Sequence, residues 1–556
     1  MQLARPGSGR LVRADHLVHE LSALPDDQAR AVVESLPAVD LLWLTRRLPH
    51  ADALMLVEYA SHDQVARMID LDAWRGDQMD LPRFLEWAGT LSEVSQEKAV
   101  AFLAEVDEEY PALSLLKAGR VADRRDIEEG DAPFDEETEE AIPTPDQQFV
   151  VVVPREDPIA APIRALIDFL YAGDLDHARL VLQAARWELP SVVEENLLHF
   201  RAGRLEEMGI PSLARAWRLF RPLSAEQESR LFAAPKLGDV GLASERLTDA
   251  LLAPLERAAD PSLEAAVQAL TDEQRARFAQ AAVYAAHKVA VTRGDDPGDQ
   301  AALTSAMQVV ADHLRLALAV LAPRADATRA LSVHPEVLFR LAHTRLVSLR
   351  QRAHAVLAPL GGHAASARFS SPWRDVLEGL LLPVPRFMRP GLSRLDDRAF
   401  LSADDLDEAR DLLDVVARQA VFFADLAAAA PDHATAPYAC LLATGLSNHA
   451  LGKGWRVRPL AASELPSLAA SLVSVRAGVA AIHDEVRAQL LSDFQAWLAS
   501  AHPERAFDPA FQRDLRVVLG RCLDDLAGAL GTADGGAFEA AGVASGVLLV
   551  EGEDVP

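Results

Sequence analysis

The sequence predicts an all-α protein: stacked short helices of a superhelical, solenoid-like type, a larger helical array and one minor β-hairpin. Half of the residues are hydrophobic, with alanine and leucine dominant, but only 6% are aromatic and few stretches are rich in valine and isoleucine. This composition favours helices over strands. Leu-Pro pairs recur at 24–25, 36–37 and 48–49, and each proline can open a helix. Glycine and serine then delimit a helical hairpin at 189–222.

Short helices with this punctuation are stable only when they stack, so we expect a stacked-helix N-terminal domain over residues 14–120. Ser61 and Gln64 have the spacing of a capping box at the start of one of its helices. A later helix carries apolar residues at helical spacing, namely Phe84, Trp87, Ala88 and Leu91.

An acidic linker is expected at 121–154. Residues 123–147 contain eleven acidic and two basic side chains, so this segment should be mobile. The run FVVVVP at 149–154 is the best strand candidate, and residues 121–127 can pair with it as a small hairpin.

The remaining boundaries follow from proline and glycine. The expected parts are a central helical domain at 155–381, a Pro/Gly-rich break at 382–401, a C-terminal helical domain at 402–530, a flexible tail at 531–556 and a loose basic arm at 1–13.

The helical hairpin begins with the start signals Pro190 and Ser191, and Gly209 is placed to end its first helix. Ser212 is placed to cap the second helix. The expected apolar face of the first helix is Val193, Leu197, Phe200 and Met208, and that of the second is Leu213, Ala216, Trp217 and Phe220.

Charged residues adjoin the first of these faces. Arg201 and Arg204 lie beside it, and Glu194 lies two turns before Arg201. We favour the interpretation that both arginines extend from the edge of the face into water. The alternative is a buried Glu–Arg network that fixes how two parts of the protein meet, because buried charges need partners.

Asp70, Asp72 and Trp74 form the group most like an enzyme site. Two carboxylates can hold a divalent cation or act as acid and base. On a helix, however, residues two apart point to different sides. We therefore favour a helix boundary at one aspartate, with Trp74 in the core.

Motifs for catalysis and for metal or cofactor binding are missing from the sequence: it has no HExxH, no GxSxG, no GxxxxGK[ST] and no GxGxxG after a strand. His50 and His62 fit helix starts better than a metal site. We expect no catalytic residue, no metal ligand and no cofactor, and we treat Glu194, Arg201, Arg204, Asp70, Asp72 and Trp74 as a candidate structural or binding network.

The charge and the length of uncharged runs limit the possible partners, and the cysteines indicate the compartment. A net charge of −28 argues against a nucleic acid as partner. No uncharged run approaches the ~20 residues of a membrane span, so we expect no membrane insertion. Cys440 and Cys522 are expected to be reduced, buried thiols of a cytoplasmic protein.

Three passages together resemble an uncharacterised bacterial family, domain of unknown function 6178: VARMIDLDAW at 65–74, ENLLHFRAGRLEEMGIPSLARAWRLF at 195–220 and HPEVLFRLAHTRLVSLRQRA at 334–353. The resemblance implies coverage from about residue 20 to 525 and brings no known activity. The Leu-Pro punctuation of residues 22–107 also resembles the superhelical N-terminal domain of bacterial magnesium transporters.

The leading hypothesis is a cytoplasmic protein-interaction or scaffold protein, because extended helical stacking comes without a catalytic set. Its partner is another protein, which the sequence does not identify, and the oligomeric state is left open. One alternative is a regulatory protein that responds to divalent cations. Another is an enzyme with an unfamiliar carboxylate/arginine site.

Overall fold

The computed structural model divides into two compact units, which are described separately. Unit 1 comprises Met1–Leu314 and Leu321–Arg340, and unit 2 comprises Arg315–Val320 and Leu341–Pro556. The structure describes residues 14–130, 135–156, 158–233, 261–322, 331, 334–371, 373–390, 395–433, 435–476, 479–501, 509–531 and 547–551. Helices dominate both units, which confirms the all-α prediction. The expected basic arm at 1–13 lies outside the described residues.

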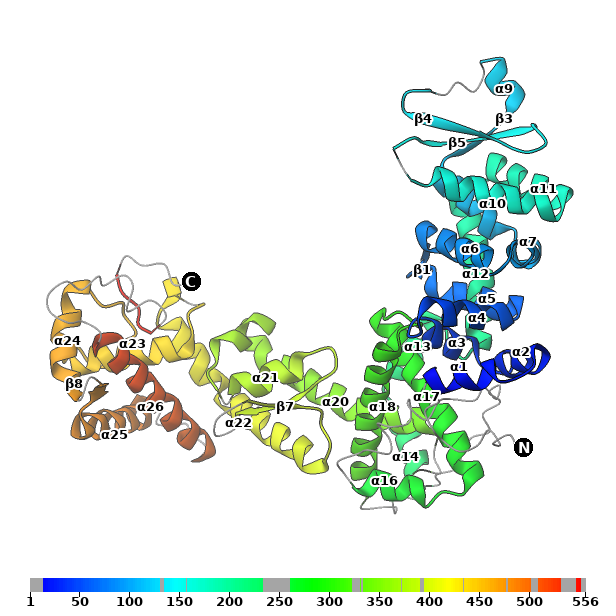
Figure 1. The fold of residues 1–556 in the computed structure, drawn as a ribbon. Coiled ribbons are helices and arrows are strands. Elements are labelled where there is room, and N and C mark those ends of the chain that lie inside the picture. Colours follow the sequence, from blue (N-terminus) through cyan, green and yellow to red (C-terminus); the bar gives the residue numbers. More distant parts are fainter. Residues whose placement is uncertain are drawn as a thin grey trace. The chain divides into compact units, whose positions relative to one another are not determined.

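Unit 1 begins with short helices that stack in chain order (Figure 1). Pro25, Pro37 and Pro49 precede three of them, and Ser61 takes the next position twelve residues on. Ser61 and Gln64 form the expected capping box. The helices are α1 (Ala14–Ser22), α2 (Asp26–Glu34), α3 (Ala38–Thr45), α4 (His50–Tyr59), α5 (His62–Asp72), α6 (Leu81–Val94), α7 (Gln96–Glu105) and α8 (Glu109–Ala118).

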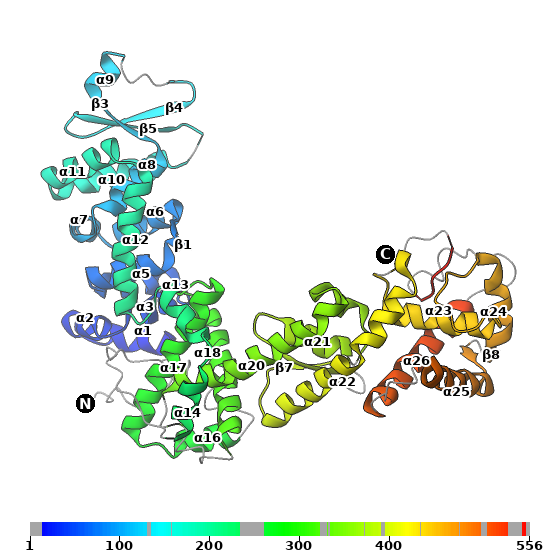
Figure 2. The ribbon, with the colours of Figure 1, turned by 180° about the vertical axis from the view of Figure 1, so that it is seen from behind.

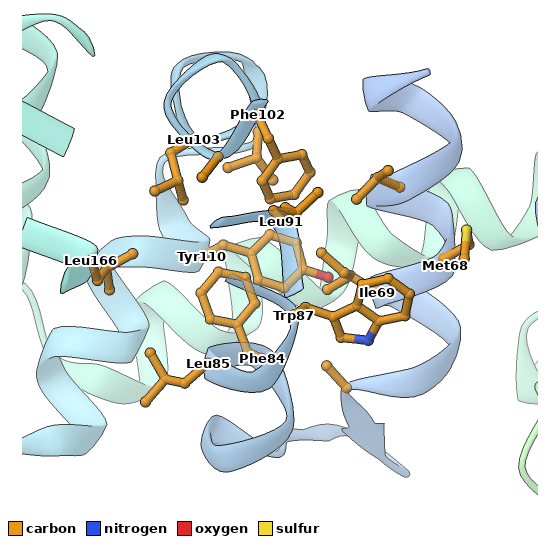
Figure 3. Close-up of a cluster of buried hydrophobic side chains, with 14 of the residues drawn as sticks. Met68, Ile69, Phe84, Leu85, Trp87, Leu91, Phe102, Leu103, Tyr110 and Leu166 are labelled. Atoms are coloured by element: carbon orange, nitrogen blue, oxygen red, sulfur yellow. The ribbon is translucent and has the colours of Figure 1, made fainter. Parts of the chain in front are cut away.

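A continuous apolar core joins these helices. Figure 3 shows the part of this core around Phe84 and Tyr110. Phe84, Trp87 and Leu91 of α6 are buried, as their helical spacing predicts. The ring of Phe84 stacks on Tyr110 of α8, with centroids 5.2 Å apart and planes within 8°. Because Tyr110 is also fully buried, its hydroxyl needs a hydrogen-bond partner inside the core.

The expected pairing of residues 121–127 with 149–154 is present, but the acidic segment adds a further strand, so the expected hairpin is a three-stranded antiparallel sheet. Strand β5 (Phe149–Pro154) lies between β3 (Arg120–Asp123) and β4 (Glu139–Pro143), with Val151 opposite both Val121 and Ile142. Pairing of β3 ends at Asp123, because its side chain caps helix α9 (Arg124–Glu128). The acidic residues lie around a valine-rich central strand, which supplies the apolar burial.

One long helix of unit 1, α12 (Pro190–Glu207), packs against α8 and α5 and runs past the stacked helices (Figure 2). The second helix of the expected hairpin is only one turn, α13 (Leu213–Ala216), continued by the 3-10 helix η1 (Trp217–Phe220). The other helices are α10 (Ala160–Gly173), α11 (Leu175–Trp187), α14 (Ala225–Ala233), α16 (Pro261–Gln268) and α17 (Asp272–Arg293), with α18 (Gln300–Leu321) and α20 (Pro335–Leu357) contributing residues to both units.

Unit 2 is also helical and packs around buried aromatic rings, including Trp373, Phe423 and Phe511. Its helices are α21 (Trp373–Leu381), α22 (Ala403–Ala428), α23 (Tyr438–Ala450), α24 (Leu465–Leu472), α25 (Asp484–Ala501) and α26 (Pro509–Gly531), with the 3-10 turns η2 (Ala358–Leu360), η3 (His363–Arg368), η4 (Pro431–His433) and η5 (Ala462–Glu464). In the residues described for either unit, no helix is both long and apolar enough to cross a membrane.

Two expectations for unit 2 are corrected. The Pro/Gly-rich break contains a hairpin of β6 (Phe387–Pro390) and β7 (Leu395–Arg398), and a second hairpin pairs β8 (Val473–Arg476) with β9 (Val479–Ile482). The tail is not flexible throughout, because Leu549 and Val550 are buried and Val550 bridges to Leu460. Their apolar side chains explain this packing, whereas residues 532–546 lie outside the described part.

Candidate functional site

The candidate residues surround a tight hairpin that follows α5. Strands β1 (Trp74–Arg75) and β2 (Gln78–Met79) pair antiparallel, and Gly76 has a φ of +65°, a conformation that favours glycine. The hairpin reverses the chain between α5 and α6, and α12 contacts it through arginine and glutamate side chains. Residues far apart in the sequence therefore meet here.

Asp70 is the centre of a buried polar network. Its side chain is fully buried and accepts two hydrogen bonds from Arg204, from Nε at 2.5 Å and from Nη2 at 3.0 Å. The hydroxyl of Tyr110 donates a third bond at 2.5 Å, and Trp74 Nε1 donates to that hydroxyl at 3.0 Å. Arg204 also pairs with Asp107. We call these five residues, together with Arg201, the Asp70 network.

Arg201 is buried and enters the network through backbone groups. Its Nε donates to the carbonyl oxygen of Asp70 at 2.8 Å, and its Nη1 donates to that of Gly76 at 3.4 Å. The guanidinium lies over the ring of Trp74, 4.8 Å from the centroid. The expectation that Arg201 and Arg204 both extend into water is therefore wrong, since Arg201 is 7% exposed and the Arg204 side chain 19%.

Burial of Arg201 also corrects the expected apolar face of α12. The buried positions are Val193, Leu197, Arg201, Leu205 and Met208. Phe200 was expected to be in the core but is 45% exposed, because Arg201 takes the position that faces α5.

The alternative of a buried network is closer to the structure, but its acidic partners are Asp70 and Asp107 instead of Glu194. The Glu194 carboxylate accepts a hydrogen bond from the backbone nitrogen of Met79 at 3.3 Å and pairs with Lys117 at 2.8 Å. Met79 lies opposite Trp74 in the small hairpin. Glu194 thus fixes α12 to the other strand of the same hairpin.

Asp72 points to a different side from Asp70, as residues two apart on a helix must. Its side chain, 3% exposed, accepts bonds from Arg83 Nε at 2.7 Å and Trp87 Nε1 at 2.8 Å and pairs with Arg46. Burial opposes ionisation of Asp72, but its bonds to Arg46, Arg83 and Trp87 outweigh burial and lower its pKa. The expected helix boundary is confirmed, because α5 ends at Asp72, and Trp74 is buried.

The Asp70 network is suited to holding helices together. Burial raises the pKa of the Tyr110 hydroxyl well above its ordinary value, with Asp70 acting in the same direction. Tyr110 therefore stays a proton donor to Asp70. Both carboxylate oxygens of Asp70 are occupied by protein donors, and the group is sealed from solvent. This arrangement joins α5, α8 and α12 and leaves no open position for a substrate at Asp70.

Several members of these contacts were not foreseen from the sequence. Tyr110, Asp107 and Lys117 belong to segments without a recognisable motif. A signal did exist for Tyr110, since a buried tyrosine in an apolar helix needs a partner for its hydroxyl.

The outer face of α12 and the helix before it expose apolar side chains. Trp187 is 73% exposed, Leu189 67%, Val192 45% and Phe200 45%. Val192 and Phe200 are eight residues apart on α12, roughly two helical turns, and Leu189 directly precedes the helix. We call these four residues the apolar stripe.

The apolar stripe belongs to the main concentration of exposed apolar residues in the described part of the chain. Eight of the nine large apolar side chains that are exposed there lie between Leu175 and Trp217. The ninth is Val517 in unit 2. Isolated exposed apolar residues are common on proteins, but contiguous groups mark binding surfaces.

Metal ligands do not cluster in the ranges that the structure describes, where no group of three or more His, Cys, Asp or Glu side chains could hold a metal ion. His50 pairs with Glu93 at 2.7 Å and His62 with Glu105 at 2.8 Å. Both histidines lie at the starts of helices, as expected.

Comparisons with known proteins identify a family but no activity. A model described as "Family of unknown function (DUF6178)" matches residues 22–550. No curated protein and no solved structure matches the chain significantly. The resemblance of the N-terminal helices to magnesium-transporter domains stays a prediction.

Proposed function

Because the chain belongs to this family of unknown function, we propose a function from the site alone: a scaffold protein that binds another protein through the apolar stripe. The proposal is supported by one observation, the exposure of four large apolar side chains within fourteen residues, at the end of α11, just before α12 and on α12: Trp187, Leu189, Val192 and Phe200. Tryptophan and phenylalanine carry much of the binding energy at protein interfaces when a partner covers them.

The Asp70 network supports the same proposal by fixing the helix that carries most of the stripe. Arg201 and Arg204 bind to α5 from one side of α12, and Glu194 binds to the small hairpin. A surface held in place before binding loses less conformational entropy when the partner arrives. The charged residues of α12 thus position its apolar outer face.

We place this scaffold in the cytoplasm. Cys440 and Cys522 are free and buried, and burial raises the pKa of their thiols, to about 11 and about 12. Cys522 Sγ lies 3.6 Å from the carbonyl oxygen of Ala439, so the two thiols belong to neighbouring parts of α23 and α26. Thiols that stay unpaired are typical of a reducing compartment.

The test compares the wild-type chain with the stripe variant Trp187→Ala/Leu189→Ser. Each tagged protein is used to capture partners from lysate of its native cells, and a recovered partner is then purified and titrated calorimetrically. We expect a stoichiometric partner whose affinity falls at least about tenfold with the stripe variant, as loss of interface anchors predicts.

The control is Val517→Ser, which removes the one large exposed apolar side chain described for unit 2, where Val517 is 49% exposed. It should leave the affinity unchanged, and thermal unfolding should show that both variants are folded. Equal binding by the wild type and the stripe variant, or no stoichiometric partner at all, would contradict the proposal.

A further inference from the structure

A second exposed group lies beyond the C-terminal end of α12 and combines apolar with cationic side chains. Leu213 is 54% exposed and Trp217 is 53% exposed, and Arg218 and Arg221 are exposed on the following turn. We call these four residues the aromatic–arginine patch. Tryptophan and arginine are the residue types most enriched in the energetic centres of protein interfaces.

The aromatic part of the patch is anchored in the core. The Trp217 ring contacts Phe220 edge-on, with centroids 6.0 Å apart, and Phe220 contacts the buried ring of Phe339 at 5.4 Å. Ala216 and Leu219 are buried on either side of Trp217. Half of the Trp217 side chain is therefore presented to solvent from a fixed base.

The arginines of the patch carry positive charge that no described carboxylate neutralises. Arg215 pairs with Glu206 at 3.0 Å, but Arg218 and Arg221 make no ion pair with any residue that the structure describes. Arg340 lies close by and donates to the carbonyl oxygens of Arg221 at 2.8 Å and Pro222 at 3.3 Å. Burial lowers the pKa of Arg340, and the charge of Arg221 acts in the same direction.

This local charge is opposite to that of the whole chain, whose net charge is −28. Two arginines that lack an ion-pair partner among the described residues, beside an exposed tryptophan, attract a segment that carries carboxylates next to an apolar side chain. The patch spans α13 and η1, four residues each. The patch has four side chains, whereas a stable interface involves roughly 20–30 residues on each side, so a short segment fits it better than a second copy.

We propose that the aromatic–arginine patch binds an acidic peptide segment of a partner protein, with an apolar anchor on Trp217 and Leu213 and carboxylates on Arg218 and Arg221. This inference rests on the proposed scaffold function and adds the chemistry of one partner. The peptide carboxylates pair with the guanidinium groups, and the anchor residue covers the indole face.

The test selects random 16-residue peptides displayed on phage against the full-length chain. The enriched sequences are synthesised, labelled with a fluorophore and titrated by fluorescence anisotropy. We expect enrichment of acidic residues beside Trp, Phe or Leu. Affinity should fall at least about tenfold with Arg218→Glu/Arg221→Glu and with Trp217→Ala, and it should weaken as salt is raised.

The control Arg230→Glu/Arg277→Glu makes the same charge change at two other exposed arginines and should bind like the wild type. Enrichment of basic or uncharged peptides, no enrichment, or equal binding by the charge-reversed variant would overturn the inference. The inference would also be overturned if the chain associated with itself, or bound a single-stranded oligonucleotide, and Arg218→Glu/Arg221→Glu abolished that binding. If a cellular partner binds the charge-reversed variant but not the stripe variant, this inference is overturned while the proposed scaffold function is supported.

Discussion

Arg204 of α12 and Asp70 of α5 are 134 residues apart in the chain and joined by two hydrogen bonds, Nε to Oδ2 at 2.5 Å and Nη2 to Oδ1 at 3.0 Å. A bidentate pair fixes both the distance and the orientation of its partners. Arg204 also pairs with Asp107, just before α8. One guanidinium thus determines how α12 lies against two other helices.

Arg204→Ala should lower the free energy of unfolding of the chain by about 3–5 kcal/mol, because it leaves the carboxylate of Asp70 buried without its main partner. The measurement is urea denaturation followed by circular dichroism. Arg230→Ala is the control, since Arg230 makes only an exposed pair with Glu226 and should cost at most about 1 kcal/mol. Coincident unfolding curves for the two variants would show that the pair contributes little to the fold.

Replacement of Leu197 and Phe200 should distinguish the two faces of α12. Leu197 is fully buried, so Leu197→Ala should cost about 2–5 kcal/mol of stability. Phe200 is 45% exposed, so Phe200→Ala should cost about 1 kcal/mol or less while weakening partner binding. Thermal denaturation compares the stabilities of the two variants, and a larger loss of stability for Phe200→Ala would contradict the assigned orientation of the helix.

The sequence predicted the class of fold because its strongest signals are local. Proline spacing and capping residues determine where helices begin, and Ser61 with Gln64 illustrates this rule. The helical spacing of Phe84, Trp87 and Leu91 likewise predicted the buried face of α6. Local signals predicted β5 and its pairing with β3, but they did not predict the third strand, β4, which lies within the acidic segment.

The membership of the candidate site was predicted in part, because Asp72 and Glu194 make other contacts, and its geometry was not predicted. Asp70, Arg201, Arg204 and Trp74 do meet, yet the predicted exposure of the arginines was wrong. A long side chain at the edge of an apolar face is buried only if another segment supplies its partners. Those partners come from distant positions, such as Tyr110, and helical periodicity does not identify them.

His287 should make the stability of unit 1 depend on pH. It lies in α17 and is 7% exposed, and burial lowers its pKa from 6.5 to about 4. Between these two values the unfolded chain binds a proton that the folded chain does not. Stability should therefore fall as pH decreases from about 6.5 to about 4, by roughly 3 kcal/mol.

The measurement for His287 compares unfolding free energies at several pH values for the wild type and His287→Leu. The variant should lose this part of the pH dependence, whatever its stability at neutral pH. His50→Gln is the control, because the His50 side chain is 71% exposed. Parallel pH profiles for the wild type and His287→Leu would contradict a neutral, buried imidazole.

Gly119 should not tolerate a side chain, because it connects α8 to strand β3 against the backbone of β5. A Cβ atom there would collide with the carbonyl oxygen of Val152, which belongs to the central strand and cannot move aside without breaking its pairing. Gly119→Ala should therefore cost about 1–3 kcal/mol in urea denaturation. Gly89 lies exposed within α6 with no atom near its Cβ position, so Gly89→Ala should instead stabilise by up to about 1 kcal/mol. Destabilisation of equal size by both substitutions would show that the loss at Gly119 is not caused by contact with β5.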